Sequence, residues 1–215
     1  MHRRHDLAWL SPDGWRHARA QAPAHAAVLI TWEQGGWPAT VRRADPDAGD
    51  DEVSLGVSVM QGGSAKLRIG FRAALADIAL ITPPLPLAAL PPGLPRAWRQ
   101  QTAALQADAL TLSLPLHFYG SASLQALTGQ AYLNDASDLD LLAYPLSRDG
   151  LCEIVERLAF HARVLPLDGE IMFPSGAAVA WKEWQMALRS ASRVLVKDLN
   201  SVRLAQPSAL LEELT

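Results

Sequence analysis

The segment over residues 137–142 most strongly constrains the fold, because two aspartates alternate with leucines in it. Successive side chains of a strand point to opposite faces, so Asp138 and Asp140 are expected on one face and the intervening leucines on the other. Two carboxylates this close repel each other unless a cation lies between them. The alternation therefore predicts a strand with one apolar and one acidic face. The alternative interpretation is that Ser137 caps the start of a helix.

The bulk properties of the chain bound its class. Its 215 residues fit one or two domains, and its formal net charge is -3 with no long basic run. Non-specific binding to nucleic acid therefore has little electrostatic support. No apolar run is long enough for a secretory signal or a bilayer span, so we expect a cytoplasmic protein with no membrane partner. The single cysteine, Cys152, excludes an intrachain disulfide and is expected on the buried side of a helix.

A dense run of prolines divides the chain between Thr82 and Pro95. Such a run stops regular structure and predicts a linker over residues 83–95. Residues 1–82 are expected to form a small β-rich domain, and residues 96–215 a domain in which helices and strands alternate. The predicted fold class is α+β.

Hydrophobic spacing and turn residues predict the elements of both parts. In the first part we expect strands over 7–10 and 39–43, a helix over 15–21, and a hairpin of 53–60 and 65–71 around a turn at 61–64. In the second part we expect helices over 98–110, 123–128, 151–163 and 183–196. Strands are expected there over 114–119, 139–144, 167–173 and 177–181.

The second part contains an ordered set of polar residues. A predicted strand ends in Gly120-Ser121, and the next predicted strand carries Asp138 and Asp140. A glycine lets the backbone approach a phosphate closely, and a serine hydroxyl can bond its oxygens. Mg²⁺ suits the paired aspartates, because it binds through one or two carboxylates plus substrate phosphates and neutralises charge as pyrophosphate leaves. The order predicts a polymerase-β-like nucleotidyltransferase domain, although the gap from Ser121 to Asp138 is longer than usual there.

A third carboxylate is expected on the neighbouring strand, as a metal ligand or as the base for the incoming hydroxyl. Asp168 and Glu170 both qualify, since they too lie two apart, and the position of Glu170 inside the strand slightly favours it. A phosphorylated substrate also needs cations, although a solvated surface charge is the simpler interpretation of each one. The candidates are Lys182, Lys197 and one of Arg42 and Arg43.

These residues belong to longer runs that carry a resemblance. The runs are Tyr119-Gly120-Ser121, Gln125 to Gly129, Tyr132-Leu133, Ser137 to Leu142, Asp168 to Ile171, Gly176 to Glu183 and Val194 to Lys197, with His5 to Leu10 and Ala39 to Arg43 in the first part. Together they resemble the phosphoribosyl-dephospho-CoA transferases of bacterial malonate decarboxylase. The resemblance covers nearly the whole chain, and Leu124 stands where the family often has an aromatic residue.

The resemblance implies an activity. Such an enzyme takes 2'-(5''-triphosphoribosyl)-3'-dephospho-CoA, transfers the phosphoribosyl-dephospho-CoA unit to a serine of the apo acyl carrier protein of malonate decarboxylase, and releases pyrophosphate. The paired aspartates of the family carry over to Asp138 and Asp140. Two alternatives stay open: a nucleotidyltransferase that uses an ordinary nucleoside triphosphate on another acceptor, and a non-catalytic binding module. The transferase of citrate lyase is a near neighbour in activity with a different carrier protein.

Overall fold

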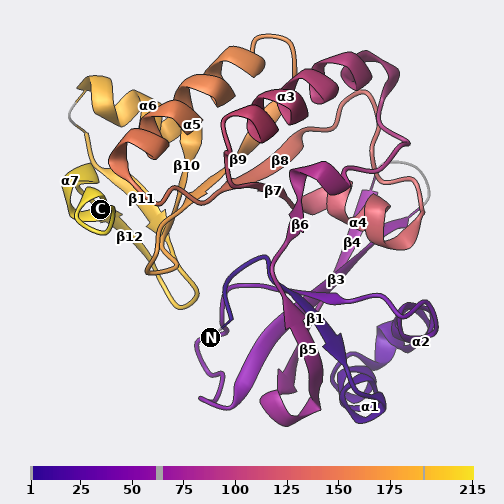
Figure 1. Cartoon of the computed structure of the whole chain (residues 1–215). Coiled ribbons are helices and arrows are strands. Elements are labelled where there is room, and N and C mark those ends of the chain that lie inside the picture. The colour runs from indigo at the N-terminus through magenta and orange to yellow at the C-terminus, as the bar shows by residue number, and fades with distance from the viewer. Residues whose placement is uncertain (1, 62–64, 191) are drawn as a thin grey trace. The chain divides into compact units, whose positions relative to one another are not determined.

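The computed structural model describes residues 2–61, 65–190 and 192–215. It divides into two compact units, Met1–Pro84 and Leu85–Thr215, each with a sheet of its own (Figure 1). The chain therefore mixes helices and strands, as an α+β protein does. Among the described residues, each helix is too short or too polar to cross a membrane.

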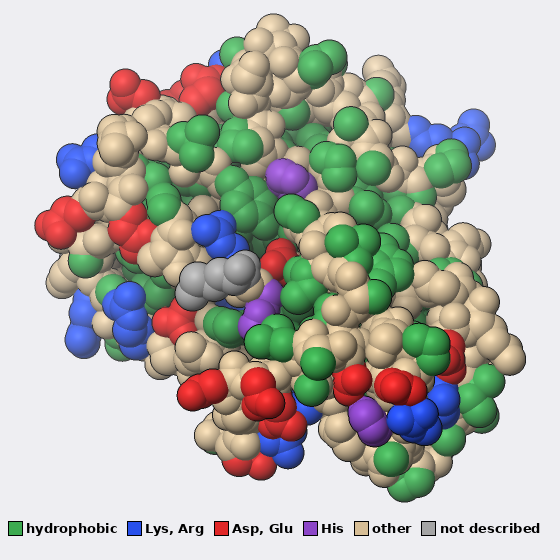
Figure 2. Space-filling view, turned by 60° about the horizontal axis from the view of Figure 1, so that its bottom comes forward, with side chains coloured by type: hydrophobic (Ala, Val, Ile, Leu, Met, Phe, Trp, Pro, Cys, Tyr) green, Lys and Arg blue, Asp and Glu red, His purple; other side chains and the backbone are tan. Residues whose placement is uncertain are grey.

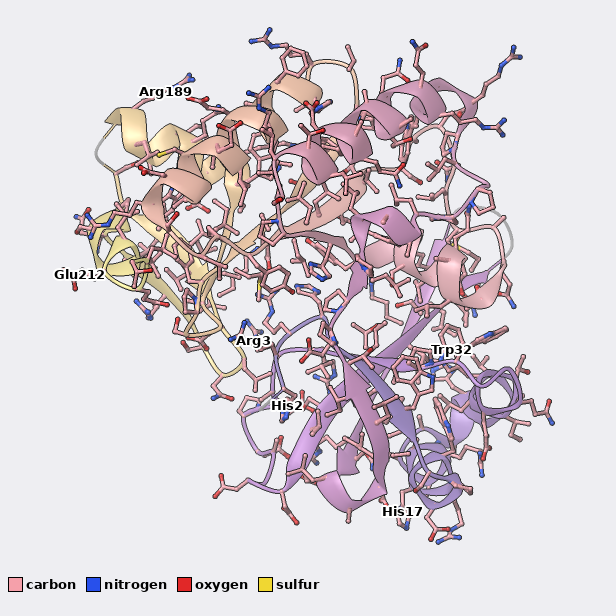
Figure 3. The ribbon with its side chains drawn as sticks, in the orientation of Figure 1. His2, Arg3, His17, Trp32, Arg189 and Glu212 are labelled. Atoms are coloured by element: carbon pink, nitrogen blue, oxygen red, sulfur yellow. The ribbon has the colours of Figure 1, made fainter. Side chains whose placement is uncertain are left out.

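The first unit is a five-stranded antiparallel sheet in the order β4-β3-β2-β1-β5, accompanied by two helices. Its core includes a tilted contact between Trp15 and Phe71, with ring centroids 6.0 Å apart. Trp32, labelled in Figure 3, is buried, and its Nε1 donates to the Pro38 carbonyl at 2.9 Å. The elements are β1 (Leu7–Leu10), α1 (Pro12–Gln21), α2 (Ala26–Gln34), β2 (Ala39–Val41), β3 (Glu52–Gln61), β4 (Ala65–Ala74) and β5 (Ile78–Thr82).

The second unit is a seven-stranded sheet in the order β12-β11-β10-β9-β8-β7-β6. Strands β8 and β9 run parallel, and every other neighbouring pair is antiparallel. Its strands are β6 (Leu85–Pro86), β7 (Leu116–Phe118), β8 (Leu139–Ala143), β9 (Leu167–Met172), β10 (Ala178–Ala180), β11 (Val194–Lys197) and β12 (Val202–Ala205). Its helices are α3 (Arg99–Thr111), α4 (Gly120–Thr128), α5 (Arg148–His161), α6 (Trp181–Ser190) and α7 (Pro207–Leu211).

Three helices of the second unit, α3, α5 and α6, lie together on one face of its sheet (Figure 1). One hydrophobic core joins them to that face, with Leu105 from α3, Ile154 from α5, Trp184 from α6 and Leu141 from β8. Because strand side chains alternate, Asp140 then lies on the opposite face, together with Asp168 and Glu170 of β9. We call this opposite face, which also carries Leu142 and Met172, the acidic face.

Several expectations need correction. The helix expected over 183–196 is α6 followed by the strand β11, because the β-branched pair Val194 and Val196 fits a buried strand face better than a helix. Lys197 therefore ends a strand. The Pro-rich stretch is not a bare linker, since Leu85–Pro86 pairs with β7 and the Leu87 side chain is buried in the second unit.

Three further expectations differ from the structure. Asp138 lies just before β8 rather than inside it, and Ser137 closes a turn by accepting from the Asn134 amide at 3.0 Å, so the helix-start interpretation is wrong. Cys152 is exposed on α5, which contradicts the buried position expected from its apolar neighbours. The predicted hairpin is confirmed as β3 and β4, but residues 62–64 of its turn lie outside the described residues.

Candidate active site

The turn from β7 into α4 forms one wall of the site. Tyr119 is extended, and Gly120 has a φ of 65° at the first position of the helix, a conformation that favours glycine. The first amides of a helix have no intrahelical acceptor, and the helix dipole adds partial positive charge there. The Gly120-Ser121 turn thus presents the start of a nine-residue helix, which is a favourable place for an anion.

Asp140 lies directly against this turn. A Cβ atom placed on Gly120 would overlap a carboxylate oxygen of Asp140, so a side chain at position 120 would displace the acid. The backbone holds the two segments in register, because the Tyr119 amide donates to the Asp140 carbonyl at 3.1 Å. The Gly120-Ser121 turn and Asp140, which the sequence analysis placed in the same ordered set of polar residues, therefore lie side by side.

Asp168 is the neighbour of Asp140 across the parallel strands β8 and β9. Neighbouring strands lie about 4.8 Å apart, so the two carboxylates start from adjacent backbone positions on the acidic face. The Asp168 side chain is 48% exposed, and Lys182 Nζ lies 3.6 Å from one of its oxygens. Gly169 permits this close strand pairing, because a Cβ there would overlap the Leu141 backbone.

Glu170 lies two residues further along β9, opposite Leu142. Its side chain is only 6% exposed, and its Oε1 accepts from Lys197 Nζ at 3.1 Å. The structure thus pairs each candidate third acid with a candidate lysine, Asp168 with Lys182 and Glu170 with Lys197.

Asp138 is exposed at the end of the loop that leads from α4 to β8. That loop is held by a residue that the sequence analysis assigned no role, Gln125 of α4. The Gln125 Oε1 accepts from the Tyr132 and Leu133 amides, both at 3.1 Å, and its Nε2 donates to the Gly93 carbonyl at 2.8 Å. Gln125 is nearly buried, and its buried amide finds hydrogen-bond partners in these backbone groups, a contact that no sequence pattern indicates.

The two arginine candidates belong to the first unit and differ in the contacts of their side chains. Arg42 makes a bidentate pair with Asp45, at 2.5 and 2.6 Å, and its Nε donates to the Leu55 carbonyl at 3.0 Å. This guanidinium holds the pKa of Asp45 below its ordinary value. Arg43 is exposed, and no ion pair of its side chain occurs with the described residues. Arg42 is therefore committed to the fold of its own unit, whereas Arg43 is available to a ligand.

His117 of β7 lies on the acidic face, opposite Leu142. Its ring meets that of Tyr144 edge-on, with centroids 5.0 Å apart, and burial lowers its pKa below the ordinary value. Its Nδ1 is buried and finds no hydrogen-bond acceptor or donor among the described residues. These contacts support a packing role for His117.

The residues fit a Mg²⁺ ion that is completed by substrate. Asp140 supplies hard oxygens, which the absence of a side chain at Gly120 lets lie against the backbone of the turn. Within the described residues, no three side chains of His, Cys, Asp or Glu are grouped closely enough to hold a metal by themselves. An ion at this place would therefore need oxygens from phosphates and water in addition to one or two carboxylates.

Charged side chains of both signs lie on the face that Figure 2 shows. On the face that Figure 2 shows, acidic and basic side chains are interspersed around the periphery. A broad positive field would raise the local concentration of any polyanion.

The comparisons with known proteins agree with these motifs. The family model described as phosphoribosyl-dephospho-CoA transferase MdcG N-terminal domain matches residues 3–84, and the model of the C-terminal domain matches residues 79–208. The chain belongs to the phosphoribosyl-dephospho-CoA transferase family. The resemblance inferred from the sequence is thereby confirmed, and the chain is a transferase by family membership.

Relatives in this transferase family align along nearly the whole chain. A phosphoribosyl-dephospho-CoA transferase of Xanthomonas euvesicatoria is 36% identical over 211 residues, which cover 96% of this chain and 95% of the relative. The enzyme of the same name from Bradyrhizobium diazoefficiens is 34% identical over 204 residues, 93% of this chain and 88% of the relative. No solved structure shows significant similarity to the chain.

Proposed function

We propose that this chain transfers the phosphoribosyl-dephospho-CoA group from 2'-(5''-triphosphoribosyl)-3'-dephospho-CoA to a serine of the apo acyl carrier protein of malonate decarboxylase, with release of pyrophosphate. The observation that carries the proposal is the packing of the Asp140 carboxylate against the Gly120 turn at the start of α4. Family membership supports the transferred group, and the acidic face supports a nucleotidyltransferase-type site.

The reaction forms one phosphodiester bond and breaks one phosphoanhydride bond. The serine oxygen of the carrier attacks the phosphorus next to the ribose, pyrophosphate leaves in line, and the hydroxyl proton passes to a carboxylate of the acidic face. Asp140, with Asp138 or Asp168, is proposed to hold Mg²⁺, which when bound would neutralise charge on the triphosphate. The amides at the start of α4 bond phosphate oxygens and orient the reacting phosphorus.

The cations have separate proposed tasks. Lys182 beside Asp168 and Lys197 beside Glu170 face the polyphosphate. Arg43, whose exposed side chain makes no ion pair with the described residues, is proposed to contact a phosphate, in preference to Arg42. The cytoplasm stays the proposed location.

Intact mass of the purified apo carrier protein tests the proposal directly. After incubation with this protein, Mg²⁺ and the triphosphoribosyl donor, we expect a mass gain equal to one phosphoribosyl-dephospho-CoA group. Asp140→Asn and EDTA should each abolish the gain. Asp149→Asn is the matched control, since Asp149 is exposed in the first turn of α5, on the helix-covered side of the sheet, and it should keep the gain.

The alternatives are outcomes of the same experiment. A gain on the citrate lyase carrier, but none on the malonate decarboxylase carrier, would replace the acceptor. If neither carrier gains mass, thermal unfolding with ATP, CTP and dephospho-CoA shows which nucleotide stabilises the fold. Stabilisation by an ordinary nucleoside triphosphate would favour a different nucleotidyltransferase, and binding without turnover would favour a binding module.

A further inference from the structure

The ion pair between the buried Glu170 and the partly exposed Lys197 suggests a joint role for these residues. Glu170 lies between Leu142 of β8 and Ala180 of β10 in the sheet, so its neighbours across both strands are apolar. A carboxylate that is 6% exposed in such surroundings needs a partner, because an isolated buried charge is strongly unfavourable. The ammonium of Lys197, 3.1 Å away, is that partner.

The direction of this pair points away from Asp140. The strand order places β11, which carries Lys197, on the opposite side of β9 from β8. To reach Glu170, the lysine crosses β10, where the two residues on this face are Ala178 and Ala180. Their small side chains leave room for the four-carbon stem, which can cover apolar surface while its charged end stays partly in water. One oxygen of Glu170 is therefore engaged on the side remote from Asp140.

Asp168 has the complementary placement. It is the direct neighbour of Asp140 across the parallel strands, and its side chain is about half exposed. The lysine that accompanies it, Lys182, is 3.6 Å away, a longer and more solvated contact than that of Lys197 with Glu170. Of the two candidate third acids, Asp168 is thus the one that shares a row of the sheet with Asp140.

We propose that Glu170 is a positioning residue, which fixes the Lys197 ammonium on the acidic face as a binding group for the polyphosphate of the donor, and that Asp168 is the acid that acts with Asp140. The inference rests on the proposed function. A fixed lysine loses less conformational entropy when it binds than a free one. Protein kinases use the same device, since a glutamate there holds the lysine that contacts the nucleotide phosphates. Lys197 remains 36% exposed, so its ammonium can pair with the glutamate and still reach a phosphate.

Binding of inorganic pyrophosphate, measured by calorimetry in EDTA, tests the lysine without metal and without turnover. Lys197→Met should weaken pyrophosphate binding by roughly tenfold or more, because it removes a charge-assisted hydrogen bond. Glu170→Gln should weaken it less but in the same direction. The double variant, which leaves no unpaired buried charge, should match Lys197→Met. Glu153→Gln disrupts the exposed pair with Arg157 on α5 and should bind like the wild type.

Binding of Mn²⁺, followed by electron paramagnetic resonance in the presence of pyrophosphate, tests the acids. Glu170→Gln should retain the Mn²⁺ affinity of the wild type once pyrophosphate is saturating, whereas Asp168→Asn should lose most of it. Circular dichroism confirms that each variant is folded. If Lys197→Met does not fold, the double variant replaces it in the pyrophosphate measurement.

Each contrary result would overturn one defined part of the proposal. Loss of Mn²⁺ affinity in Glu170→Gln would make Glu170 a metal ligand, and unchanged or tighter pyrophosphate binding in that variant would refute positioning. Full pyrophosphate affinity in the double variant would remove Lys197 from the site. The variants could bind pyrophosphate and Mn²⁺ as expected while the wild-type protein leaves the carrier unmodified. That outcome would refute the proposed acceptor and support the inference.

Discussion

Two glycines at the ends of α4, Gly120 as its first residue and Gly129 as its C-cap, allow a paired test of the site, because they share a backbone conformation but not an environment. Gly120 and Gly129 have φ values of 65° and 69°, so alanine at either position is strained by about 1–2 kcal/mol. A Cβ on Gly129 would meet nothing within 4 Å, whereas a Cβ on Gly120 would overlap the Asp140 carboxylate. The difference between the two variants therefore isolates the effect on Asp140.

We expect Gly129→Ala to lower the free energy of unfolding by about 1 kcal/mol and to leave kcat/KM for transfer unchanged. Gly120→Ala should lose a similar or larger amount of stability, and its kcat/KM should fall by about 100-fold. That magnitude is typical when a catalytic group is misplaced by about 1 Å, and Asp140 must turn away by at least that much to admit the methyl group.

Urea unfolding gives the two stabilities, and the rate of mass gain on the carrier gives the two values of kcat/KM. The rate must be measured at a temperature where both variants are fully folded. Equal kcat/KM for Gly120→Ala and Gly129→Ala would refute the reasoning, since it would mean that the position of the Asp140 carboxylate beside the turn has no bearing on transfer.

Three further predictions follow from contacts outside that turn. Gln125→Leu leaves two backbone amides and one backbone carbonyl without their partner, and it should lower the free energy of unfolding in urea by about 2–4 kcal/mol. The control Gln100→Leu, on the exposed side of α3, should cost almost nothing. Burial lowers the folded-state pKa of His117, so the unfolded state binds more protons than the folded state below about pH 6.5. The free energy of unfolding therefore falls as the pH drops. Between pH 7.5 and pH 5.5, His117→Gln should lose less unfolding free energy than the wild type. Arg43→Ala should raise KM for the donor and leave the free energy of unfolding unchanged. Arg42→Ala should lower the free energy of unfolding by about 1–2 kcal/mol, because it breaks the pair with Asp45. An unchanged KM in Arg43→Ala would remove that residue from the site.

Local patterns predicted most elements of the second unit because each pattern has a single physical cause. The alternation around Asp140 gave a strand with its leucines in the core, and the spacing from Leu151 gave the helix α5. The pattern failed where two causes compete. Val194 to Val196 directly follow a stretch that fits a helix, and only pairing with β10 and β12 decides for the strand.

Some site contacts could not be predicted, because they depend on which strands are neighbours. The choice between Asp168 and Glu170 as third acid rested on position within one strand, yet what separates them in the structure is pairing with β8. The partners of Gln125 lie in a loop and in the Pro-rich stretch, and no periodicity links those segments. Likewise, adjacent arginines look equivalent in sequence, and the bidentate pair with Asp45 becomes visible only when the chain folds back.

The Lys197–Glu170 pair shows most directly why composition and spacing stop short of a site. In sequence the two residues are separated by a turn, a strand and a helix, and each alone is an ordinary surface charge. In the sheet they are brought together across β10, and the contact requires that Ala178 and Ala180 be small on that face. A larger residue at either alanine would block the lysine without touching a charge. In the sequence the alanines of β10 look like ordinary small core residues. In the structure their size is one of the conditions that let the acidic face hold a fixed cation.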